Sequence, residues 1–193
     1  MTAFPDVRLA TSRLDLRPLG PADAPALYAV FSDPRVMRYW CSGPWTAVAE
    51  AEARIDRHQV AMAAGEFLAL GIVRRDDGLL LGTCTLFHLS AQCRRAELGY
   101  GLRTDAWGQG YAAEAVGELL RCGFTDLALH RVEADVDPRN LASVRLLERL
   151  GFTREGLLRE RWIVEGEISD AAFYGLLRRE WEALRAAPPV PFA

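Results

Sequence analysis

Hydrophobic and polar residues along the chain follow two periods, and these predict a succession of strands and helices. Alternation at every second residue is typical of a half-buried strand, whereas apolar residues three and four positions apart indicate a helix with one buried face. On this basis we expect strands over residues 13–19, 67–73, 79–87, 94–102, 132–136, 159–164 and 168–177. We expect helices over residues 24–31, 46–64, 110–124, 140–151 and 180–184.

Turn signals separate these elements without dividing the chain. Asp77-Gly78 is typical of a hairpin, Asp137-Pro138-Arg139 turns the chain before a helix, and Glu165-Gly166 joins the last two strands. We find no internal repeat and no long linker. The sequence therefore predicts one domain over residues 1–187 and a proline-rich tail over residues 188–193 that we expect to be disordered.

Composition narrows the functional classes. The chain has 193 residues, of which 50% are hydrophobic and 25% charged, and this suits one globular domain with a self-supporting core. A net charge of -3 argues against a nucleic-acid partner. All 23 basic residues are arginine, which excludes a catalytic lysine, a Schiff base and a phosphate-binding lysine of the Walker type.

The remaining composition signals concern metals and membranes. The four cysteines form no C-x-x-C pair and the three histidines form no H-E-x-x-H motif, so we expect no metal site. We see neither a signal-peptide pattern nor an apolar run approaching the ~18–20 residues that cross a bilayer. We therefore expect a cytoplasmic protein with reduced thiols and no membrane partner.

A glycine-bearing turn is the most informative part of the chain. The predicted strand over residues 94–102 leads through Gly108 and Gly110 into an alanine-rich helix. The first N–H groups of a helix lack intrahelical partners and carry partial positive charge, so they can bind phosphate through the main chain alone. Glycines let a ligand approach the backbone and adopt positive φ angles that other residues avoid. We expect a pyrophosphate at this helix start.

Six segments carry a family resemblance that spans nearly the whole chain. They are residues 9–19 (LATSRLDLRPL), 33–37 (DPRVM), 97–100 (ELGY), 107–115 (WGQGYAAEA), 140–143 (NLAS) and 147–152 (LERLGF). In this order they resemble the GNAT superfamily of acyl-CoA-dependent N-acyltransferases, and within it the RimJ/RimL-type branch. The resemblance implies an α/β (α+β) fold with a mixed, mostly antiparallel central sheet, a V-shaped splay and flanking helices.

The resemblance also implies acetyl-CoA as co-substrate and no metal. The pantetheine arm would lie in the splay, and the pyrophosphate would lie at the following helix. The family pattern Gln/Arg-x-x-Gly-x-Gly/Ala reads W-G-Q-G-Y-A here, so Trp107 replaces the usual polar residue. The residues that we expect to bind the cofactor are Tyr100, Gly101, Leu102, Trp107, Gly108, Gln109, Gly110, Tyr111, Ala112, Asn140 and Ser143.

Acyl transfer from a thioester to an amine needs a base, an oxyanion donor and a group that stabilises the thiolate. Glu97 is the candidate base, at the position where some GNAT enzymes carry a catalytic glutamate, and partial burial would raise its pKa. An ordinary strand residue paired with Arg94 or Arg95 fits the sequence equally well. A main-chain N–H within residues 100–102 is the candidate oxyanion donor, or else makes a normal sheet bond.

The candidate acid is Ser143, although a small polar residue is common in a first helical turn. Asn140 could contact the cofactor, cap the helix, or do both. A covalent route through Cys84 or Cys93 is the rival mechanism, and we disfavour it because neither thiol has a histidine or a helix start beside it to lower its pKa.

The acceptor site is expected between residues 37–45 and the last hairpin, near Trp162 and residues 165–167. Aromatic and acidic side chains there suit a cationic amine, but Tyr39, Trp40 and Trp45 fit a core role at least as well. The resemblance implies direct transfer in a ternary complex, with a protein N-terminal α-amine as the first acceptor. The alternatives are a small amine (antibiotic, polyamine or amino acid) or a non-catalytic acyl-CoA-binding sensor, and a homodimer is compatible with the family.

Overall fold

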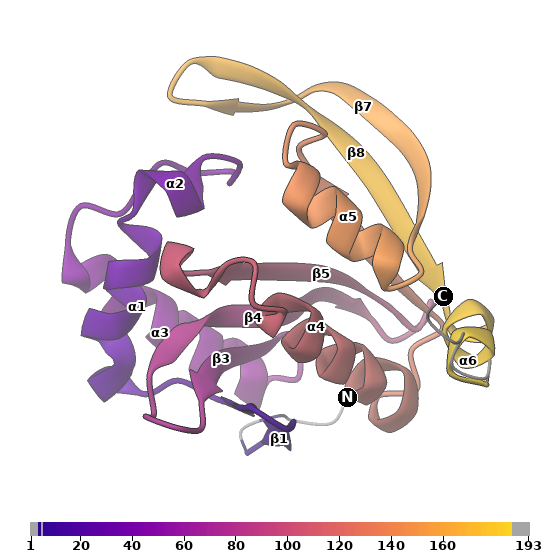
Figure 1. The fold of residues 1–193 in the computed structure, drawn as a ribbon, viewed down its shortest axis with the longest axis horizontal. Helices are drawn as coiled ribbons and strands as arrows, with labels where there is room; N and C mark the ends of the chain where they lie inside the picture. Colours follow the sequence, from indigo (N-terminus) through magenta and orange to yellow (C-terminus); the bar gives the residue numbers. More distant parts are fainter. Residues whose placement is uncertain (1–3, 5, 187–193) are drawn as a thin grey trace.

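One mixed sheet carries the fold, with its strands in the spatial order β1-β2-β3-β4-β5-β6-β8-β7 (Figure 1). The computed structural model describes residue 4 and residues 6–186, and these contain eight strands. The strands are β1 Leu9–Ala10, β2 Leu14–Arg17, β3 Leu68–Arg74, β4 Leu80–Ser90, β5 Arg95–Leu102, β6 Arg131–Val136, β7 Thr153–Val164 and β8 Glu167–Leu177. The predicted tail over residues 188–193 lies outside the described residues.

The splay arises between β5 and β6, the one parallel pair of neighbours in the described part of the sheet. Their register ends where Glu97 lies opposite Glu133. Beyond this point β5 stays paired with β4 as far as Leu102, and β6 stays paired with β8 as far as Val136. The two halves of the sheet therefore part beyond Glu97, and the predicted mixed, mostly antiparallel sheet with a V-shaped splay is confirmed.

Helices cover both faces of this sheet. In Figure 1, α4 lies in front of β4 and β5, whereas α3 lies behind them. The helices are α1 Ala24–Phe31, α2 Pro34–Met37, α3 Val48–Ala63, α4 Tyr111–Arg121, α5 Leu141–Arg149 and α6 Arg178–Ala186. The face of α4 that the sequence predicts to be apolar packs on the sheet through Ala115, Val116, Leu119 and Leu120, all of which are buried.

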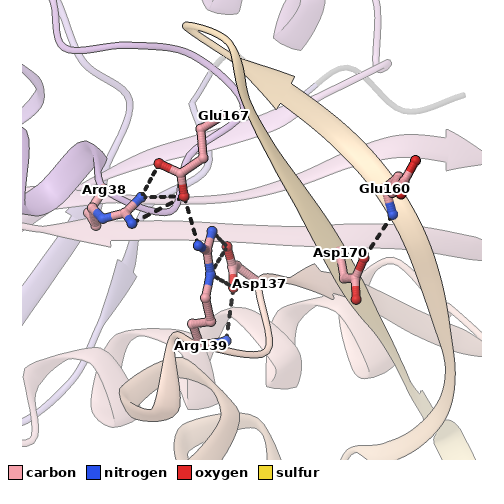
Figure 2. Close-up of polar contacts among 6 residues, drawn as sticks. All are labelled: Arg38, Asp137, Arg139, Glu160, Glu167 and Asp170. Atoms are coloured by element: carbon pink, nitrogen blue, oxygen red, sulfur yellow. Dashed lines mark hydrogen bonds and ion pairs between the residues drawn. The ribbon is translucent and has the colours of Figure 1, made fainter.

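The strand β7 is longer than its apolar pattern predicts. It begins at Thr153 rather than at residue 159, and all of its residues except Val164 are exposed, so no alternation marks its first half. A register shift between Leu158 and Trp162 interrupts its pairing with β8, and within this interval Glu160 adopts a left-handed backbone with a φ of +53°. The Glu160 N–H donates to Asp170 Oδ1 at 2.8 Å, which holds this bulge in place (Figure 2).

Two helix starts also differ from the prediction. The sequence pattern does not predict α2, a four-residue helix that begins at Pro34 and is capped by Asp33. The helix that we expect over residues 46–64 begins at Val48, and Ala47 occupies its N-cap position. The carboxylate of Glu50 replaces a side-chain cap by accepting from the N–H groups of Thr46 at 2.7 Å and Ala47 at 3.2 Å.

Glu114 fixes the start of α4 against the β1–β2 hairpin. Its carboxylate accepts hydrogen bonds from Thr11 Oγ1 at 2.5 Å, from the Arg13 N–H at 2.9 Å and from Arg13 Nε at 2.7 Å. Burial opposes the charged form, but these donors outweigh it and lower the pKa of Glu114 to about 2. The glycine-bearing turn before α4 is thus attached to the sheet by one ionised carboxylate.

We expect Glu114→Gln to reduce the free energy of unfolding at pH 7 by about 1–3 kcal/mol, since hydrogen bonds to a charged group are lost. Because the folded pKa is lowered from 4.5 to about 2, the difference between wild type and variant should be full above pH 4.5 and shrink toward pH 2. Urea unfolding at pH 7 and pH 3 measures this. Glu52→Gln on exposed α3 is the control, and equal stability of wild type and Glu114→Gln at pH 7 would contradict the anchoring role.

Candidate active site

A cavity of about 650 Å³ lies at the splay. Its walls come from β5 and β6 where they part, the start of α5, the segment after α2 and the β7–β8 hairpin. Among the predicted catalytic and cofactor-binding residues, Glu97, Tyr100, Asn140 and Ser143 line the cavity, whereas Gly101 and Leu102 do not. The candidate base on β5 and the candidate acid on α5 therefore line one cavity, although α4 and β6 lie between them in the sequence.

The carboxylate of Glu97 lines this cavity from the last residue of β5 that pairs with β6. Its side chain is 20% exposed, and Oε2 lies 3.0 Å from His88 Nδ1. Neither expected alternative partner pairs with Glu97: Arg95 binds Glu133 at 2.6 Å, and Arg94 is exposed in the β4–β5 turn. Sequence reasoning missed His88, whose side chain meets Glu97 because the register shifts between Phe87 and Ser90.

A second carboxylate, Asp135, faces the same cavity from β6. Its side chain is 10% exposed, and Arg161 Nε lies 3.6 Å from Oδ2. Burial raises the pKa of Asp135, and the nearby charge of Glu97 raises it further, while Trp162 and Arg161 act in the opposite direction. Sequence reasoning missed this residue, although the alternation of β6 places Asp135 on the face opposite its buried neighbours.

The backbone of β5 points polar groups into the splay. The Arg103 N–H donates to Leu81 O at 2.8 Å, so residues of odd number on this strand direct their N–H groups toward β4. By alternation the N–H groups of Tyr100 and Leu102 point to the opposite edge, where β6 has departed. The Leu102 carbonyl on that edge accepts from Trp107 Nε1 at 2.8 Å. Tyr100 thus supplies a preorganised main-chain donor beside the cavity.

The phenol of Tyr100 and the start of α5 face each other across the splay. Asn140 caps α5, since its Oδ1 accepts from the Ser143 N–H at 3.2 Å, and this capping role agrees with the sequence. The Tyr100 hydroxyl is buried, with no hydrogen-bond acceptor or donor within normal distance in the described part of the chain. Burial raises the pKa of Tyr100 to about 12, despite the opposing effect of the neighbouring Ser143 hydroxyl. Both hydroxyls therefore stay protonated at neutral pH.

The glycine turn before α4 forms an open backbone cradle outside the walls of the cavity. Gly108 and Gly110 adopt φ angles of +72° and +81°, as the sequence predicts for a turn that only glycine tolerates. A Cβ on Gly108 would meet nothing within 4 Å, so the space beside it is open to a ligand. The side chains of Trp107 and Gln109 bind Leu102 O and Asp105 O, which leaves main-chain N–H groups as the donors here. A diphosphate fits this cradle.

The predicted aromatic wall is divided between cavity and core. Tyr39, Trp40 and Trp162 line the cavity. Trp45 packs on Phe31 with ring centroids 5.0 Å apart and belongs to the core, which corresponds to the alternative that the sequence left open. Three aromatic side chains therefore line the cavity beside the carboxylates of Glu97 and Asp135.

An ion-pair network joins the β7–β8 hairpin to both sides of the cavity (Figure 2). Glu167 on the hairpin accepts from Arg38 after α2 at 3.1 Å and from Arg139 before α5 at 2.7 Å. Asp137 in turn accepts from Arg139 Nη2 at 2.6 Å. The network thus holds the hairpin over the cavity, and because Arg38, Arg139 and Glu167 are partly exposed, salt should screen these ion pairs.

The two cysteines considered for a covalent route, Cys84 and Cys93, lie away from the cavity, whereas the exposed thiol of Cys41 lines it. Burial, with a smaller effect of Cys122, raises the pKa of Cys84 to about 12, and Cys93 is exposed in the β4–β5 turn. Neither lines the cavity. Over residue 4 and residues 6–186 we find no group of three His, Cys, Asp or Glu side chains placed to hold a metal ion. No helix in that part of the chain is both long and apolar enough to cross a membrane.

Comparisons with known proteins agree with this geometry. The acetyltransferase (GNAT) domain family matches residues 13–153. The uncharacterised N-acetyltransferase p20 of Bacillus licheniformis is 38% identical over 173 residues, which cover 90% of this chain and 97% of p20. Spermidine N(1)-acetyltransferase of Escherichia coli K12 is 27% identical and covers 90% of each chain. A Vibrio cholerae structure described as a "putative ribosomal-protein-serine acetyltransferase" superposes with a TM-score of 0.77 at 26% identity, over 90% of this chain and 98% of that one.

The family match covers most of the chain, and the similarity to p20 covers nearly all of it. The splayed sheet with its backbone cradle is the architecture that the family resemblance implies. Acetyltransferases of this family use acetyl-CoA. The chain belongs to the GNAT family and is an acetyl-CoA-dependent N-acetyltransferase.

Proposed function

We propose that the enzyme acetylates a primary amine by direct attack in a ternary complex, with Glu97 as the general base. The observation that carries this proposal is the position of the Glu97 carboxylate, in the cavity and at the residue where β5 and β6 part. An amine bound on the aromatic wall would meet this carboxylate first. The contact with His88 Nδ1 holds Glu97 in place for proton transfer.

The remaining groups have separate roles in the transfer. Acetyl-CoA supplies an activated thioester, held by the main-chain N–H groups of residues 108–112 and by the start of α5. The Tyr100 N–H donates to the acyl oxygen as negative charge develops on it. The hydroxyls of Tyr100 and Ser143 are the candidate donors to the departing sulfur, whose reference thiol pKa of about 8.5 makes this help modest.

Two acceptor classes remain, and different observations support each. A protein N-terminal α-amine is the first, supported by the similarity to the Vibrio cholerae protein and by the RimJ/RimL-type motifs. A small amine is the second, supported by the bridge from Glu167 to Arg38 and Arg139, which encloses the acceptor side, and by the similarity to the spermidine enzyme. We place the peptide amine first because the cavity remains large enough, at about 650 Å³, for a terminal residue.

We expect Glu97→Gln to lower kcat by about 10²- to 10⁴-fold, since general-base help is removed, while the Kd for acetyl-CoA stays unchanged. Thiol release from acetyl-CoA with an active amine, together with calorimetric titration of CoA, measures both values. Glu148→Gln on the exposed side of α5 is the matched control and should retain full turnover. Wild-type turnover in Glu97→Gln would rule out Glu97 as the base.

Gly108→Ala tests the backbone cradle, because its Cβ would crowd a bound diphosphate and its φ of +72° is strained for alanine. Gly78→Ala is a matched control, since Gly78 has a φ of +71°, equally open surroundings and a place in the β3–β4 turn. Both should lose about 1–2 kcal/mol of stability. Only Gly108→Ala should weaken CoA binding, by about tenfold or more. Equal CoA affinity in the two variants would argue against the cradle.

A further inference from the structure

The guanidinium of Arg54, on α3, lines the acceptor side of the cavity without a counter-ion. Three aromatic rings surround it, with centroids 4.7 Å (Phe31), 5.6 Å (Trp40) and 5.5 Å (Trp45) from its central carbon. Such cation–π contacts use the face of each ring. They leave the in-plane N–H donors of the guanidinium without an acceptor among the described residues, and since none of its nitrogens is fully buried, a ligand in the cavity can reach them.

Arg54 is unusual among the arginines of this chain. Within the described residues, nine arginine side chains make no hydrogen bond and no ion pair. Arg54 is one of these nine, and the remaining eight are all exposed. Burial lowers the pKa of Arg54 to about 10, so it remains a cation at neutral pH. The imidazole of His58, one turn away, is neutral, because burial and the nearby arginines lower its pKa to about 4. The same helix carries Glu50, Glu52 and Asp56, but none of them forms an ion pair with Arg54.

The other charges around the cavity are matched. Arg38 and Arg139 both bind Glu167, and Arg161 lies against Asp135. Arg54 is the only arginine in the described lining of the cavity without an ion-pair partner, and a bound anion would supply one. The imbalance is thus local and lies at one end of the acceptor site.

Arg54 lies on the same face of the sheet as the candidate base. A Cβ on Gly101 would stand 2.7 Å from the ring of Trp40, so Trp40 packs directly on this residue. Gly101 and Glu97 are four residues apart on β5 and therefore share a face. Since Arg54 stacks on Trp40, an acceptor on this face can reach Glu97 with its amine and Arg54 with another group.

We propose that Arg54 is a specificity-determining residue that binds a carboxylate carried by the amine acceptor. This inference rests on the proposed amine acetylation and names its substrate class as an amino-carboxylate. A planar carboxylate matches the in-plane donors of a guanidinium in a bidentate pair. The carboxylate has two possible sources, a free amino acid or an acidic side chain close to a peptide N-terminus.

The test compares carboxylates with their amides. Glycine, β-alanine and 4-aminobutyrate are assayed by thiol release against their primary amides, and short peptides with Asp as the second residue against the same peptides with Asn. With wild type, kcat/KM should favour the carboxylates of one set by about 10- to 100-fold. Arg54→Met, which keeps an apolar chain among the rings, should reduce the ratio of kcat/KM between carboxylates and amides to about one, because KM for the carboxylates rises. Arg57→Met, an exposed neighbour on α3, should leave it unchanged.

Several outcomes would overturn the inference. The first is a wild-type ratio of kcat/KM near one between carboxylates and amides that are acetylated. The second is an equal loss of kcat/KM for carboxylates and amides in Arg54→Met. The third is that Arg54→Met alters the preference between acetyl-CoA and succinyl-CoA and leaves the acceptor preference unchanged. If no amine is acetylated, the proposed function fails by itself. Calorimetric titration of the same amino acids and peptides into the CoA-bound protein then decides the inference, because binding that Arg54→Met abolishes supports it and absence of binding to wild type overturns it.

Discussion

The short parallel pairing of β5 with β6 is the constraint on which the site depends. Where the pairing ends at Glu97, the backbone of β5 loses its neighbour, and its N–H groups face open space instead of a strand. A sheet paired to its end would bury the same groups in ladder bonds and leave no cavity. The cavity, the main-chain donor at Tyr100 and the approach of Ser143 all follow from this one interruption.

Charge is distributed around the cavity so that most ionised groups restrain the walls. Glu114 attaches the cradle to the sheet, and Glu167 ties the hairpin to Arg38 and Arg139. The carboxylate of Glu97, the hydroxyls of Tyr100 and Ser143 and the guanidinium of Arg54 also line the cavity but take no part in these restraints. The ion-paired residues thus fix the shape of the cavity, and the remaining groups are those that can contact an acceptor.

The sequence predicts most of the fold, the glycine turn before α4 and the cap of α5, because these depend on local signals. Gly108 and Gly110 are marked by residue type, and Asn140 is marked by its position before a helix. His88 and Arg54 carry no such signal. The contact of His88 with Glu97 depends on a register shift in β4, and the role of Arg54 depends on how α3 sits against Trp40.

Initial-rate kinetics with varied acetyl-CoA and varied amine, combined with mass spectrometry of the product, test direct transfer in the cavity most directly. The account predicts intersecting double-reciprocal lines, an N-acetylated amine and no acetylated form of the protein. Parallel lines with an acetyl group retained on a cysteine would contradict direct transfer. Binding of acetyl-CoA without thiol release for any amine would contradict catalysis at this site.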